Sequence, residues 1–150
     1  MKHMDMDLFG QGKYMHALEE KELAEVISKV LYPEDNHLEG KALRLKQQYF
    51  FVSASMQNIV SGFKAKGNNI RDLANRIVVQ INDTHPALSI PELMRILMDE
   101  EDLGWDEAWE ITTHTFAYTN HTIMEEAMEK WPADLFKDLL PRLWDIVCEI

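Results

Sequence analysis

Apolar residues recur at helical spacing through most of the chain and predict a mainly helical protein. A first helix is predicted over about 14–31, and it ends before Pro33 because the residue preceding a proline is pushed out of the helical region. Its apolar stripe consists of Leu23, Val26, Ile27, Val30 and Leu31.

A second and longer helix is predicted from about Leu38 to Lys64. Its apolar residues repeat in 4-3 spacing, which alone would be typical of a coiled coil. Further apolar residues, among them Phe50 and Phe51, widen the apolar face well beyond a coiled-coil seam. We therefore expect this helix to be buried inside a larger protein.

Two short apolar segments in the second half of the chain predict strands. Ile77–Ile81 is rich in β-branched residues and almost continuously apolar, as in a parallel strand covered on both faces. Thr115–Tyr118 predicts a second short strand. A parallel strand with fewer than two partners leaves backbone groups unpaired, so we expect its neighbouring strands to lie outside this sequence.

Helices are predicted around these strands. Two segments, Ser89–Glu92 and Thr122–Glu125, have the spacing of a capping box and each predicts the start of a helix. The fold class predicted is therefore mainly α with one or two buried parallel strands. The shorter predicted helices are 70–76, 89–101, 106–113, one from Thr122 that stops before Pro132, and two that flank Pro141.

Composition and charge narrow the classes of protein. The 150 residues fit one soluble domain, and no apolar run reaches the roughly 18 residues of a membrane span. A net charge of −11 argues against a nucleic-acid partner, which would need a basic face. Because Cys148 is the single cysteine, no intramolecular disulfide can form, and we expect a reducing, cytoplasmic location.

Two segments with one layout are the candidates for chemistry. Each has an apolar strand, a short polar loop and a predicted helix start, and ligands of α/β sheets bind at the carboxyl ends of strands. The loops 82–86 and 119–121 each offer an asparagine and a histidine, and Asp83 adds a carboxylate. Such groups suit a polyhydroxylated ligand better than a phosphate. Residue types alone leave a turn-only role open, since Asn and Asp are common in turns.

Other polar and aromatic residues give weaker signals. The six histidines form no metal-binding motif, and neither a dinucleotide-binding nor a phosphate-binding loop is present. We expect the acidic run 99–102 to be a solvated helix end, Trp105 and Trp109 to belong to the core, and Cys148 to be unreactive.

Three motifs in series resemble the α-glucan phosphorylases, the family of glycogen, starch and maltodextrin phosphorylases. Residues 82–95 resemble its NDTHP-x-L-x-IPELMR segment, and residues 117–122 resemble its AYTNHT segment. Residues 31–50 resemble its LYP-x-DN-xx-EGK-x-LRLKQ-x-YF stretch. The matches run from about Phe9 to Ile150, whereas residues 1–8 look unmatched, like a start codon with residues added for expression.

The resemblance implies a fold and an activity. Residues 9–150 would form part of the N-terminal domain of an α/β, Rossmann-like enzyme of the GT-B type. The parent enzyme would phosphorolyse terminal α-1,4-glucosyl units of glycogen or maltodextrin to glucose 1-phosphate. It would use pyridoxal phosphate, whose lysine lies outside this chain, so we expect this chain alone to bind no cofactor and to be inactive.

The resemblance also assigns roles to residues. It implies a tower-like helix over 12–31 that contacts its twin in a homodimer, a gate-like loop over 32–40, and sugar-pocket loops over 82–86 and 118–122. The implied glucose-binding residues are Asn36, Asp83, His85 and His121, with Asp35 and Asn36 in the gate-like loop. Two alternatives stay open, a self-associating helical module and a sugar-binding domain without chemistry.

Overall fold

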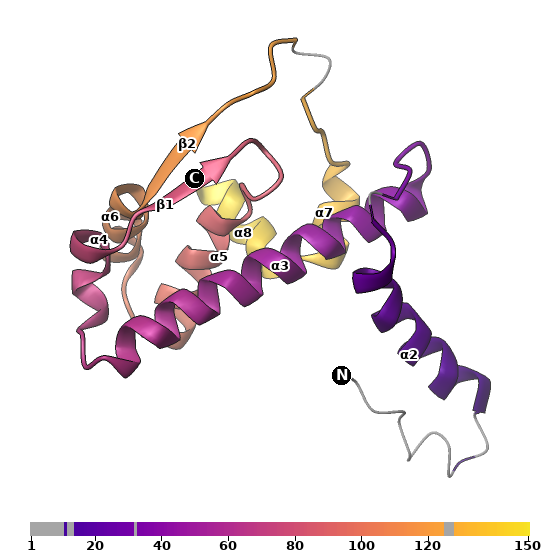
Figure 1. The fold of residues 1–150 in the computed structure, drawn as a ribbon, viewed down its shortest axis with the longest axis horizontal. Coiled ribbons are helices and arrows are strands. Elements are labelled where there is room, and N and C mark those ends of the chain that lie inside the picture. Colours follow the sequence, from indigo (N-terminus) through magenta and orange to yellow (C-terminus); the bar gives the residue numbers. More distant parts are fainter. Residues whose placement is uncertain (1–10, 12–13, 32, 125–127) are drawn as a thin grey trace. The chain divides into compact units, whose positions relative to one another are not determined.

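The computed structural model describes residues 11, 14–31, 33–124 and 128–150, and it is mainly helical (Figure 1). The chain divides into two compact units, Met1–Gln47 and Gln48–Ile150. No helix within the described residues is long and apolar enough to cross a membrane.

The first unit contains α2 (Tyr14–Lys29), the loop that follows it and the first turns of α3 (Leu38–Ala65). The end of α2 is held by Gln47, whose side-chain amide donates to the carbonyls of Ile27 (3.1 Å) and Val30 (2.6 Å). These bonds satisfy carbonyl groups that have no partner within the helix. The predicted first helix is thus confirmed over 14–29.

The long helix α3 buries one face rather than most of its surface. Within the second unit, Phe50 and Phe51 are 51% and 59% exposed, and burial of this helix inside a larger protein stays a prediction. The helix ends at Ala65, two residues before Gly67, which has a φ of 78° and so adopts the left-handed conformation common after a helix. The buried face consists of Val52, Met56, Val60 and Phe63.

Two parallel strands form the only sheet among the described residues. Strand β1 (Val79–Asn82) pairs with β2 (Phe116–Thr119), with Val79 opposite Phe116 and Asn82 opposite Thr119. The parallel pairing confirms the predicted strands, each shifted by one or two residues. Ile81 is the only buried residue of the two strands in this chain, and cover from neighbouring strands outside this sequence stays a prediction.

Helices connect the strands and build the core of the second unit. Before β1 come η1 (Ile70–Asp72) and α4 (Leu73–Arg76), and between the strands lie α5 (Ser89–Arg95), the π-helical turn η2 (Ile96–Glu100) and α6 (Trp105–Thr115). After β2 come α7 (Ala133–Leu139) and α8 (Pro141–Glu149). Helix α5 packs against α6 and α8, and α4 packs against α6. The large fully buried apolar side chains from these helices are Leu73, Leu93, Met94, Ile96, Leu97, Leu143 and Ile146.

Neither predicted capping box forms its capping bonds, although α5 does begin at Ser89 as predicted. Ser89 is the first residue of α5, and its hydroxyl donates to the carbonyl of Pro86 instead of capping the helix. The helix predicted from Thr122 is absent from the described residues, since 122–124 and 128–131 are not helical. Residues 125–127, which belong to the same prediction, lie outside the described residues.

Candidate functional site

Polar residues gather where the two strands end. Because β1 and β2 are parallel and Asn82 pairs with Thr119, the loops that follow both strands leave the sheet at one edge (Figure 1). The N–H of Asp83 donates to the carbonyl of Thr119 at 2.8 Å and extends the ladder by one residue. The loops 82–86 and 118–122 therefore begin side by side, and we call them the rim.

Side chains bridge the two segments in steps along the rim. The amide of Gln80 donates to the hydroxyl of Thr119, and one step further the ring of His121 bonds the amide oxygen of Asn82. A third bond then links Thr122 to the carboxylate of Asp83. The distances are 2.6 Å for Gln80 Nε2 to Thr119 Oγ1, 2.5 Å for His121 Nε2 to Asn82 Oδ1, and 3.4 Å for Thr122 Oγ1 to Asp83 Oδ1.

Some of these polar groups also serve the local turns. Asp83 has a φ of 67°, a left-handed conformation that Asp tolerates better than most residues, and its carboxylate accepts from the N–H of Thr84 at 2.7 Å. The side chain of Asn120 accepts from the N–H of Thr122 at 2.8 Å and donates to its carbonyl at 3.2 Å. Asn120 is therefore a turn residue, whereas Asn82 and Asp83 reach across to the other loop.

The remaining predicted site residues do not take part in these bonds. His85 belongs to the rim but is exposed, in the turn that follows Asp83. Asp35 and Asn36 belong to the first unit, where Asp35 Oδ2 accepts from Arg44 Nη1 at 3.0 Å and Asn36 Nδ2 donates to Glu34 Oε1 at 2.9 Å. The structure thus brings Asp83 and His121 together at the rim. Tyr32 of the gate-like loop and residues 12 and 13 of the tower-like helix lie outside the described residues.

The residue types of the rim limit the ligands that it could hold. Residues 82–86 and 118–122 contain neither lysine nor arginine. Pyridoxal phosphate does not fit such a rim, because it needs a lysine amine for its aldehyde and cations for its phosphate. Among the described residues, no group of three or more His, Cys, Asp or Glu side chains is placed to hold a metal ion. The rim can therefore offer hydrogen bonds to hydroxyl groups.

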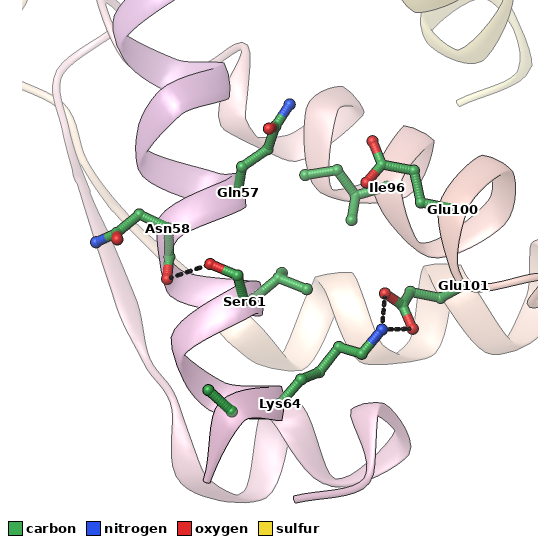
Figure 2. A pocket seen from close by; sticks show the side chains of 9 residues that line it. Gln57, Asn58, Ser61, Lys64, Ile96, Glu100 and Glu101 are labelled. Carbon is green, nitrogen blue, oxygen red and sulfur yellow. Dashed lines mark hydrogen bonds and ion pairs between the residues drawn. The ribbon is translucent and has the colours of Figure 1, made fainter. Parts of the chain in front are cut away.

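Two surface hollows in the second unit are separate from the rim. Figure 2 shows one of about 480 Å³ between α3 and the π-helical turn, lined by residues that include Gln57 and Lys64 of α3 and Glu100 and Glu101. The second hollow, of about 490 Å³, lies between α4 and α6. Neither is lined by Asp83, His85 or His121, so these hollows do not coincide with the predicted sugar residues.

A buried charged cluster escaped the sequence interpretation. Glu92 is fully buried and accepts two bonds from Arg95, at 2.9 and 3.0 Å, and one from the hydroxyl of Ser53 at 2.7 Å. Burial, together with the nearby negative charge of Glu92, raises the pKa of the Tyr49 phenol. The spacing of three residues between Glu92 and Arg95 on one helix was the available signal.

The acidic run 99–102 is largely exposed at a helix end, as predicted, and three of its four carboxylates are also paired. Asp99 pairs with Arg142, Glu100 with Arg95, and Glu101 with Lys64, whose Nζ lies 2.5 and 2.7 Å from the two carboxylate oxygens (Figure 2). Three consecutive carboxylates thus bond cations from three different helices. The two tryptophans expected in the core, Trp105 and Trp109, are half-buried, and Cys148 is exposed.

Comparison with known proteins gives a consistent result. The chain is 56% identical over 146 residues to glycogen phosphorylase 2 of Dictyostelium discoideum, a match that covers 97% of this chain and 15% of that protein. It is 55% identical over 130 residues to the glycogen phosphorylase of Bacillus subtilis, covering 87% of this chain and 16% of the relative. It is 52% identical over 150 residues to the human brain form, covering 95% and 18%.

The chain therefore spans about a sixth of the length of these relatives. The family model described as carbohydrate phosphorylase matches residues 1–150, which include the strands, the rim and the helices between them. The chain belongs to the carbohydrate phosphorylase family.

Proposed function

We propose that this chain is the part of a glucan phosphorylase that forms one side of its glucose subsite. The observation that carries the proposal is that relatives 52–56% identical over nearly the whole chain are named glycogen phosphorylases. The whole enzyme would transfer terminal α-1,4-glucosyl units to phosphate and release glucose 1-phosphate. This chain alone would be inactive, since it supplies only part of the site.

The chemistry of the rim supports a sugar as its ligand. Asp83 and His121 come from two loops that leave the sheet together, and both are hydrogen-bonding groups at a neutral or acidic surface. A site built to bond hydroxyls discriminates strongly, because its polar groups lose partners when the matching hydroxyl is missing. His85, in the turn next to them, is proposed to complete this side of the subsite.

The phosphate chemistry is assigned to other parts of the enzyme. The rim offers no lysine or arginine, so inorganic phosphate and pyridoxal phosphate would be held elsewhere. When bound, the cofactor would supply acid–base chemistry through its phosphate group. The residues of this chain would bind and orient the glucosyl unit.

We also propose roles for the first unit. The loop with Asp35 and Asn36 would act as a gate, and the ion pair between Asp35 and Arg44 would fix its conformation when closed. A gate excludes water, so that phosphate rather than water takes the glucosyl group. Helix α2 would contact its twin in a homodimer; its exposed Leu23 supports this proposal. A cytoplasmic location is proposed for the enzyme.

The test is phosphorolysis of maltodextrin with phosphate and added pyridoxal phosphate. We expect activity in the longer enzyme that carries this segment and none in the 150-residue chain. In the longer enzyme, His121→Ala should lower kcat/KM by roughly tenfold or more, because a hydrogen bond to the sugar is lost. The control is His114→Ala, an exposed histidine of α6 away from the rim. Equal effects of the two variants, or a longer enzyme without activity, would contradict the proposal.

A self-associating module is the second candidate, and exposed apolar side chains favour it. Phe50 and Phe51 are more than half exposed, and Ile123 is 97% exposed. Exposed apolar groups of this kind drive association. Two results together would support the module. Light scattering would show that this chain forms oligomers as its concentration rises, and the longer protein would show no phosphorolysis. Saturable maltose binding without activity would instead support a sugar-binding domain.

A further inference from the structure

His121 of the rim is held by a side chain for which no role has been assigned. His121 Nε2 lies 2.5 Å from Asn82 Oδ1, the side-chain oxygen of the last residue of β1. This oxygen can only accept, so the ring must donate its Nε2–H. In a neutral imidazole the other nitrogen, Nδ1, is then an acceptor without a proton.

The bond follows from the register of the sheet and is not an isolated contact. Asn82 and Gln80 are two residues apart on β1 and so point to the same face, opposite to the buried Ile81. Each reaches a side chain two positions beyond its strand partner, Thr119 for Gln80 and His121 for Asn82. The backbone bond from Asp83 to Thr119 keeps this register beyond the last strand pair. The position of the ring is therefore set by the parallel strands through Asn82.

We infer that Asn82 is a positioning residue of the glucose subsite, which orients the His121 ring and fixes its tautomer so that Nδ1 accepts from a sugar hydroxyl. This inference rests on the proposed function for its ligand. The bond between Asn82 and His121 exists without sugar. The role of Asn82 and the binding of sugar can therefore be tested separately in one sample.

The experiment is a nitrogen-15 spectrum of the histidine rings in the 150-residue chain, recorded without sugar at a pH where the ring is neutral. The His121 signals are identified as those that disappear from the spectrum of the His121→Gln variant. We expect a protonated Nε2, an unprotonated Nδ1, and an Nε2 proton protected from exchange with water. The opposite tautomer would overturn the inference, because the amide of Asn82 would then be donating to the ring.

Variants test whether Asn82 causes this state. Asn82→Ala should speed exchange of the Nε2 proton by roughly 2- to 10-fold, the range expected for one lost hydrogen bond. Asn82→Asp keeps an acceptor oxygen and should restore protection. Gln80→Ala is the matched control, because it removes the preceding bridge on the same face but leaves Asn82 in place. Unchanged exchange in Asn82→Ala, or the same change in Gln80→Ala, would overturn the inference.

Titration of the same samples with maltose then tests the ligand. A change in the His121 Nδ1 signal that saturates with maltose, and that weakens in Asn82→Ala, is expected if the rim binds sugar. A lack of response to maltose in the wild-type chain would count against sugar binding by this chain. The protonation state of the ring, measured without sugar, would still decide the role of Asn82.

Discussion

Glu92 carries a negative charge into the core of the second unit. Its side chain is fully buried, and Arg95 meets it with two parallel hydrogen bonds, a geometry that fits carboxylate and guanidinium well. A buried charge of this kind is stable only while its partner is present. The Glu92 carboxylate also accepts from Ser53, so α3 and α5 are joined through one polar contact.

Loss of the partner should therefore be costly. Arg95→Leu leaves Glu92 buried and unpaired, and we expect the free energy of unfolding to fall by about 3–5 kcal/mol. The matched control is Arg71→Leu, which breaks the exposed pair with Glu107 and should cost about 1 kcal/mol or less. Urea denaturation followed by circular dichroism measures both. If the free energy of unfolding falls by a similar amount in the two variants, the buried pair stabilises the fold no more than the exposed pair does, which would contradict the prediction.

The rim shows how far residue-level prediction reached. Asp83 and His121 were predicted from their motifs, and the structure brings them to one edge of the sheet. The hydrogen bond between Asn82 and His121 could not be predicted, because it depends on the register between two strands that are far apart in the sequence. The sequence also could not show that Asn120 bonds its own turn whereas Asn82 bonds the other loop, because both are asparagines that follow or end a strand.

At the scale of elements, the loop before α3 depends on a glycine. A Cβ on Gly40 would overlap the backbone carbonyl of Glu34, so the loop and the first turn of α3 approach as closely as they do because no side chain intervenes. The loop is also tied to α3 by the bond between Asp35 and Arg44. Its conformation is therefore set by both a close backbone approach and an ion pair.

We expect Gly40→Ala to displace this loop while helices α2 and α3 remain. Hydrogen exchange measured by mass spectrometry should then show faster exchange in peptides covering 33–37, and an unchanged rate in peptides from the middle of α3. Gly62→Ala on α3 is the control, since a Cβ there meets no atom within 4 Å. Exchange in 33–37 that is unaffected by Gly40→Ala would contradict the close contact.

Helices and strands with strong apolar periodicity were predicted well, whereas the capping bonds of the two capping signatures were not. The capping signature at Thr122 is local, but in the structure its hydroxyl donates to Asp83 and its N–H to Asn120. A side chain used in a contact between loops is unavailable for a helix cap. In the same way, the Ser89 hydroxyl donates to the nearby carbonyl of Pro86, and the Glu92 carboxylate accepts from Ser53 of α3, so neither side chain is available for the capping pattern.

At the scale of the molecule, ion pairs link elements that are distant in the sequence. Asp99 in the π-helical turn bonds Arg142 in α8 at 2.6 and 2.9 Å. The Arg142 guanidinium lowers the pKa of the Asp99 carboxyl through a hydrogen bond and its charge, although partial burial opposes this. A carboxyl with a lowered pKa in the folded state stabilises that state above its unfolded pKa of about 4, and the stabilisation disappears as the pH falls through the folded pKa.

Asp99→Asn should therefore lower stability at pH 7 but not in strong acid. Because the pair is partly exposed, we expect a loss of about 1 kcal/mol or less at pH 7, which disappears as the pH falls through the lowered pKa of Asp99. Thermal unfolding at several pH values measures it. Asp138→Asn, an exposed aspartate of α7, is the control. A difference between wild type and Asp99→Asn that is constant with pH would rule out this linkage.

The π-helical turn explains how three neighbouring carboxylates find three separate cations. In this turn the N–H of Glu101 donates to the carbonyl of Ile96, five residues earlier, at 3.1 Å. Such a turn holds one residue more than an α-helical turn, as if a single codon had been inserted without breaking the helix. Removal of that codon would rotate everything beyond it by about 100° and carry the carboxylates away from their cations. We therefore expect evolution to conserve the length of this segment more strictly than its composition.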